Sequence, residues 1–256
     1  MPKTTDMTIP ENLKCLIYGD PGSGKTYTLG TAPKPMYILD TDNGVQTLAG
    51  VPGIEYNVYK PTEDKTNLRP IQKLIAKINS LVDECPYETV ALDSATNLAK
   101  LLQYRIITMA GRWDETNKMR IQDWGALKDD MAEVFESIQS IDSHVIVTGH
   151  NRVVQPTDED GNPQGETLYL CLSEAGQAYP QKAPADFDEI YKMDVQTRPR
   201  SGTEYRIMTE SDRKWTAKSR LNYYDPDTQE VKRVLDKYEN NDLTEIIDKV
   251  TKARKQ

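Results

Sequence analysis

The stretch Gly19-Asp-Pro-Gly-Ser-Gly-Lys25-Thr26 decides the fold of this chain. It follows the pattern G-x-x-x-x-G-K-[ST], whose glycines let the backbone curl so that successive N–H groups point at phosphate oxygens. An apolar run, Leu13–Tyr18, precedes it and a helical segment opens at Lys25, so strand, loop and helix follow in the required order. We therefore predict a nucleotide-binding loop made of Gly19, Asp20, Pro21, Gly22, Ser23, Gly24, Lys25, Thr26 and Tyr27.

This loop predicts ATP and Mg²⁺ as cofactors. The Lys25 ammonium would reach the β- and γ-phosphates, and the Thr26 hydroxyl would ligate the metal ion. A carboxylate from a neighbouring strand end should hold the hydration shell of Mg²⁺, and Asp93, directly after Thr89–Leu92, is placed for it. Asp93 could equally begin a helix as its N-cap, and both roles are compatible.

Apolar runs and helical periodicity alternate up to His150 and predict an α/β fold with a mostly parallel sheet flanked by helices. Two turn-rich hairpins follow, with strands at 151–155 and 167–172, then at 190–197 and 204–209. We expect one domain over residues 1–256, with its core at about 11–221 and a helical tail at about 222–256.

Composition narrows the class of protein further. The 256 residues carry a formal net charge of −8, whereas dedicated nucleic-acid binders are usually basic. An acidic protein can still bind nucleic acid through a local basic strip. No apolar run approaches the roughly 20 residues that cross a bilayer, so we expect no membrane contact and a cytoplasmic location.

Three further segments carry polar side chains at or near the expected strands and are candidate parts of the site. Met36–Leu39 is followed by Asp40-Thr-Asp42-Asn-Gly44, which also reads as a turn. Val145–Val147 leads to His150, and Lys214-Trp-Thr-Ala-Lys218-Ser-Arg220 places two cations two residues apart. On a strand, that spacing would point both cations to one side.

In this order, YGDPGSGKT, YILDTDNG, TVALDSATN, IQDWGALKDD before VIVTGHN, and KWTAKSR resemble the phage-encoded RecA-core P-loop ATPases. That group of AAA-like nucleotide-binding proteins includes the Sak-four type of single-strand annealing protein. The resemblance implies a RecA-like core and catalytic roles for Lys25, Asp42, Asp93, His150, Lys218 and Arg220. Asp42 stands where the recombinases carry a water-polarising Glu, and His150 stands where they carry a γ-phosphate-sensing Gln. Because Asp is one methylene shorter than Glu, turnover could be slow.

The same resemblance implies a homo-oligomer, ring or filament, with nucleotide at the subunit interface and Lys218 and Arg220 reaching the neighbour's nucleotide. It further implies single-stranded DNA as partner, annealing in phage recombination, and action beside a single-strand DNA-binding protein. The DNA-facing loops would be 111–120, with Arg112, Trp113, Lys118 and Arg120, and 151–174, with Arg152. Both loops could equally be solvated surface.

Two other functions stay open. An AAA-type remodelling or helicase-loader ATPase would share the phosphate loop, but that class normally carries a helical lid after the core. A small-molecule kinase would need an acceptor pocket and would leave Asp42 unexplained.

Overall fold

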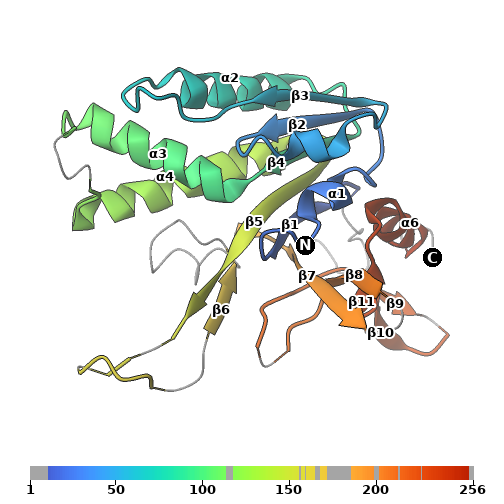
Figure 1. Ribbon diagram of the computed structural model, residues 1–256. Coiled ribbons are helices and arrows are strands. Elements are labelled where there is room, and N and C mark those ends of the chain that lie inside the picture. Colours follow the sequence, from blue (N-terminus) through green and yellow to red (C-terminus); the bar gives the residue numbers. More distant parts are fainter. Residues whose placement is uncertain are drawn as a thin grey trace, which may run out of the picture.

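The computed structural model describes residues 11–113, 118–155, 157–158, 160–164, 168–171, 186–198, 202–212, 214–225 and 227–253. Within these ranges a nine-stranded sheet forms the centre of the molecule (Figure 1). Its strands are β1 Lys14–Gly19, β2 Met36–Asp40, β3 Ile54–Val58, β4 Thr89–Asp93, β5 His144–Val154, β6 Leu168–Cys171, β7 Glu189–Arg198, β8 Gly202–Met208 and β11 Tyr238–Asn240.

The strands run in the order β11-β8-β7-β1-β5-β4-β2-β3, and β6 pairs with the outer part of β5. β1 pairs in parallel with β5 and β7, and β4 pairs in parallel with β5 and β2, which in turn pairs with β3. β8 and β11 then continue the sheet in antiparallel fashion. The predicted fold class, a mostly parallel sheet with antiparallel additions, is confirmed.

Helices cover both faces of this sheet. Helices α2 Arg69–Asp83, α3 Ala95–Met109 and α4 Ile121–Ser140 lie on one face (Figure 1). On the other lie α1 Lys25–Leu29, the 3-10 helix η2 Gly44–Leu48 and α6 Leu243–Ala253. Leu16 and Tyr18 of β1 join the first core cluster and Cys15 and Ile17 the second, because successive residues of a strand point to opposite faces. This two-sided burial explains the continuous apolar run of β1.

Three local expectations were wrong. Residues 222–240, expected within a helical tail, contain β9 Asn222–Asp225, β10 Glu230–Arg233 and β11, so α6 is the one helix among the described residues of the tail. Strand β5 does not end near His150 but runs to Val154, because β6 extends its hydrogen-bond ladder. The segment 214–220 is not a regular strand, since the Asp212 carboxylate accepts hydrogen bonds from the backbone of Lys214 and Trp215.

No helix in the described part of the chain is long and apolar enough to cross a membrane.

Candidate functional site

The predicted phosphate loop lies between β1 and α1. Gly22 and Gly24 adopt φ values of 77° and 90°, a left-handed conformation that glycine takes without steric cost. The Lys25 ammonium turns back into the loop and donates to the carbonyl oxygens of Gly19 at 3.0 Å and Asp20 at 2.9 Å. Burial lowers the pKa of Lys25, and Asp93, Asp20 and Asp42 oppose this shift through their charges. The loop therefore holds its cation in place before any phosphate arrives.

Ser23 provides a test of whether phosphate fits this loop. Its hydroxyl is buried and has no hydrogen-bond partner within the described residues. An unsatisfied buried hydroxyl costs about 1–3 kcal/mol, which an accepting phosphate oxygen would recover. The helix that follows has only five residues, so its dipole contributes little. The binding groups are therefore the loop's N–H groups, Lys25 and Ser23.

The predicted metal-binding pair meets directly. The Thr26 hydroxyl donates to Asp93 Oδ2 at 2.7 Å, and the Thr148 hydroxyl of β5 donates to Asp93 Oδ1. Burial raises the pKa of Asp93, while these two hydrogen bonds lower it. A hydroxyl and a carboxylate beside a phosphate loop are the hard oxygen ligands that Mg²⁺ prefers, so the residues fit this ion. Thr148 was not predicted from the sequence.

Gly44 closes this pair from the other side. A Cβ atom at Gly44 would lie 3.2 Å from both Asp93 Oδ2 and Thr26 Oγ1. A larger residue here would therefore require the side chains of Asp93 and Thr26 to shift by a few tenths of an ångström.

The two acids after β2 have different tasks. The Asp40 carboxylate accepts backbone N–H groups from Asp42, Asn43, Gly44 and Val45, at distances from 2.6 to 3.3 Å. Asp42 is exposed and accepts a hydrogen bond from Asn97 Nδ2 at 2.6 Å. Its charge acts on both Lys25 and Asp93. The segment can therefore be both a turn and part of the site. Asp40 stabilises the turn, and the turn places Asp42 near Lys25 and Asp93.

His150 lies level with Gly19 on the neighbouring strand, and its backbone N–H donates to Thr96 Oγ1 at 2.9 Å. This places it at the start of the phosphate loop, in the middle of β5.

The two late cations lie together along β7. Lys218 pairs through its backbone with Ile190, and the Arg220 guanidinium forms an ion pair with Asp188. The Arg220 side chain is 65% exposed. Burial lowers the pKa of Lys218, and the nearby charge of Arg220 lowers it further.

The residues predicted to contact DNA divide into two groups. Arg112 donates to Asp123 at 2.6 Å, and Trp113 donates to Thr108 at 2.7 Å, so both side chains are held within the protein. Lys118 and Arg120 are exposed, and Arg152 is partly buried on β5. Residues 114–117 lie outside the described residues, as do 156, 159, 165–167 and 172–174 of the second loop.

A pocket of about 390 Å³ adjoins the phosphate loop and is lined by Gly24, Tyr27, Tyr205 and Asn241. The Tyr205 ring packs on the loop, since a Cβ atom at Gly24 would lie 3.3 Å from it. Asn241 Oδ1 accepts from the Thr28 hydroxyl at 2.6 Å. An aromatic ring and an amide beside a phosphate site suit a nucleotide base. Tyr205 and Asn241 are more than 170 residues from Tyr27 in sequence, so no local signal could reveal them.

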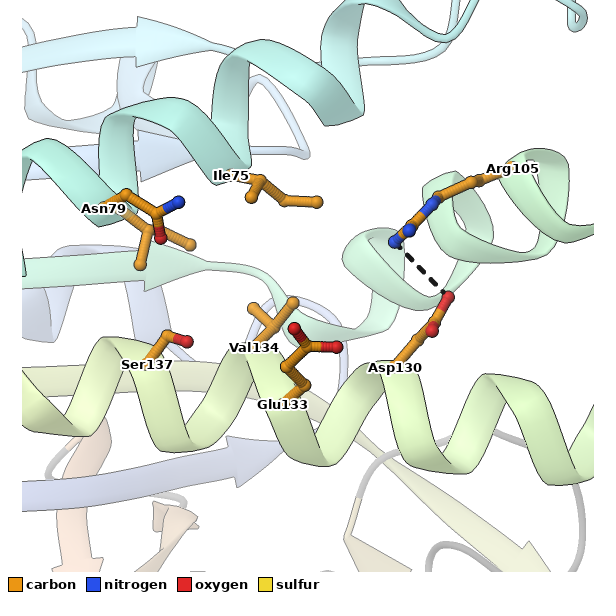
Figure 2. A pocket seen from close by; sticks show the side chains of 8 residues that line it. Ile75, Asn79, Arg105, Asp130, Glu133, Val134 and Ser137 are labelled. Carbon is orange, nitrogen blue, oxygen red and sulfur yellow. Dashed lines mark ion pairs between the residues drawn. The ribbon is translucent and has the colours of Figure 1, made fainter.

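A second hollow, of about 140 Å³, lies among α2, α3 and α4 (Figure 2). Arg105 and Asp130 form an ion pair across it at 3.6 Å. It contains none of the predicted site residues.

The region that matches a known protein family includes the phosphate loop. The profile of a family described as AAA domain matches residues 11–221. No curated protein matches the chain.

Several solved structures resemble the chain. The flagellar accessory protein FlaH of Methanocaldococcus jannaschii is 12% identical with a TM-score of 0.37, covering 78% of each chain. A KaiC-like protein of Pyrococcus horikoshii OT3 is 11% identical with a TM-score of 0.38, covering 87% of this chain and 90% of that one. A type III secretion ATPase of pathogenic bacteria is 13% identical with a TM-score of 0.46, covering 72% of this chain and 52% of that one.

Proposed function

Since the chain belongs to the AAA domain family through residues 11–221 and is a P-loop ATPase, we propose that it uses Mg²⁺–ATP to bind single-stranded DNA and promote strand annealing in phage recombination. The observation that carries the nucleotide part is the contact between Thr26 and Asp93 beside the buried ammonium of Lys25. The DNA part is supported by the resemblance of the motifs to phage RecA-core ATPases.

Each residue of the site has a separate task in this proposal. Lys25 and the loop's N–H groups would hold the β- and γ-phosphates, and Thr26 and Asp93 would hold Mg²⁺. The ion would supply positive charge beside the phosphoryl group that is transferred. Asp42 orients the attacking water and His150 senses the γ-phosphate. Because the shorter Asp42 side chain reaches less far than a Glu would, hydrolysis is slow.

Lys218 and Arg220 act on the nucleotide of a neighbouring subunit in a homo-oligomer. The exposed guanidinium of Arg220 supports this role, since a cation that reaches a second subunit must project from the surface. Asp188 then orients Arg220 until the neighbour arrives.

The last part of the chain favours annealing over protein remodelling. Within the described part of residues 186–253, the chain returns to the sheet through β7, β8 and β11, and a single helix of eight residues or more, α6, follows. A helical lid of the kind that remodelling ATPases carry is therefore not present in those described residues.

Steady-state ATP hydrolysis with and without single-stranded DNA tests the proposal, with Lys25→Ala as the blank. We expect DNA to stimulate hydrolysis in the wild type and the variant to be inactive. Hydrolysis indifferent to DNA would refute the DNA part and favour a protein substrate.

A mixing experiment tests the shared site. Lys25→Ala and Arg220→Ala should each be inactive alone, yet regain activity when mixed, because one subunit then supplies the intact loop and the other the intact arginine. If the mixture stays inactive, Arg220 does not act on the nucleotide of a neighbouring subunit. It would then act within its own subunit or have no catalytic role.

A further inference from the structure

A groove of about 660 Å³ lies at the outer edge of the sheet, between the end of β3 and the start of α2. Four cationic side chains line it: Lys60, Arg69, Lys73 and Lys77. The last three are spaced four residues apart on α2 and therefore share one face of the helix. Asn57, Thr62 and Asn67 add polar groups to the same lining.

None of these four cations forms an ion pair within the described part of the chain, although the protein as a whole is acidic. Lys77 lies over the Tyr37 ring at 4.4 Å. The acids closest in sequence, Glu55, Glu63 and Asp64, do not line the groove. Asp64 accepts from the backbone and hydroxyl of Thr66 at 3.0 and 2.7 Å, and Glu55 accepts from Tyr87 at 2.8 Å. The lining of the groove thus carries four cations and no acid.

This arrangement is unfavourable for the isolated helix. Like charges four residues apart repel each other, and Arg69 opens α2, where the helix dipole disfavours a cation and no acid stands in the first turn. An anionic ligand would remove both penalties.

We infer that this groove binds the phosphate backbone of single-stranded DNA. Successive α2 cations are about 6 Å apart along the helix, and the row from Arg69 to Lys77 extends about 12 Å. A row of this length suits a string of phosphates better than one phosphate ion, and its spacing resembles that of phosphates along an extended strand. The amides and the hydroxyl of the lining can bond bases without strict sequence preference.

The groove is connected to the nucleotide site through Asp40. Val58 at the end of β3 is paired with Asp40, and the Tyr59 backbone N–H donates to the Asp40 carbonyl at 2.6 Å. The Asp40 carboxylate in turn holds the turn that presents Asp42. The groove residues Val58 and Tyr59 are therefore paired with Asp40, which precedes the proposed water-orienting Asp42 by two residues. A DNA strand bound in the groove would lie beside this pairing. This coupling, and the choice of DNA as ligand, rest on the proposed function.

The test is the affinity for a fluorescent oligo-dT strand, measured by anisotropy at several salt concentrations. The double variant Arg69→Ala/Lys73→Ala removes two exposed charges from the groove. The matched control, Lys237→Ala/Lys252→Ala, removes two exposed charges, one beside β11 and one on α6. We expect the groove variant to bind at least tenfold more weakly and its slope of log affinity against log salt to fall by about 1.4, because each single-strand phosphate contact contributes about 0.7. The control should behave as wild type, and ATP affinity should be unchanged in both.

Wild-type affinity and salt slope in the groove variant would overturn the inference, above all if Lys118→Ala/Arg120→Ala weakened DNA binding instead. A wild-type protein that binds ATP but no DNA would refute the DNA part of the proposed function, and this inference with it. Groove-dependent binding to phosphatidylserine vesicles without DNA binding would also overturn it.

Discussion

Replacing Thr148 by Val tests how the buried carboxyl group of Asp93 is stabilised in the core. Both residues are buried, and the Thr148 hydroxyl donates to Asp93 Oδ1. Valine preserves the shape of threonine but cannot donate. A hydrogen bond to a charged group contributes about 1.5–3 kcal/mol to stability, so we expect the free energy of unfolding at pH 7 to fall by about that amount.

Thr89→Val is the matched control. Thr89 is equally buried, lies on β4, the strand that carries Asp93, and donates at 2.9 Å to the neutral carbonyl of Pro33. A bond between neutral groups contributes about 0.5–1.5 kcal/mol, so its loss should cost less. Urea unfolding measures both changes.

The pH dependence separates the two cases. Burial raises the pKa of Asp93 in the folded state above the ordinary 3.8 of the unfolded state. Between the unfolded-state pKa and the folded-state pKa, the folded protein binds more protons, so its stability falls as pH rises through this interval. Loss of the Thr148 hydrogen bond raises the pKa further. The deficit of Thr148→Val should therefore be small near pH 3 and grow toward pH 7, and that of Thr89→Val should stay constant. Equal deficits in the two variants, or a deficit of Thr148→Val independent of pH, would refute this account.

Three further predictions concern other parts of the site. Gly44→Ala places a methyl group 3.2 Å from side-chain oxygens of Asp93 and Thr26. We expect its rate of ATP hydrolysis to fall about tenfold, since small displacements of reacting groups are costly. The control Gly125→Ala, for which no contact within 4 Å is found, should hydrolyse ATP as wild type does. Tyr205→Ala should weaken ATP binding about tenfold in calorimetry through lost stacking, but leave tripolyphosphate binding intact. A hydrogen bond from Arg112 lowers the pKa of Asp123, so Arg112→Leu should reduce stability in urea unfolding at pH 7 and lose this deficit as pH falls toward 3.

The sequence alone determined the features that depend on neighbouring residues. The phosphate loop, the strands β1, β2 and β4 and the long helices were predictable because glycine placement and apolar periodicity act over a few residues. Asp93 could be paired with Thr26 by the same logic, since the carboxyl ends of parallel strands meet at one edge of the sheet. Where long-range pairing competes with local pattern, as in β5 and residues 214–240, prediction failed.

The residues that complete the site from distant segments became visible only in the three-dimensional structure. Thr148 and Gly44 lie inside quoted motifs, but nothing local shows that they contact Asp93. Tyr205 and Asn241 come from two distant segments and carry no motif of their own. Arg112 looked suited to DNA until Asp123 proved to be its partner. The row of cations on α2 is visible in the sequence, but its lack of neutralising acids is not. Spacing along the chain predicts which side chains share one face of a helix or strand. Whether a polar side chain finds a hydrogen-bond or ion-pair partner depends on how the distant elements pack together.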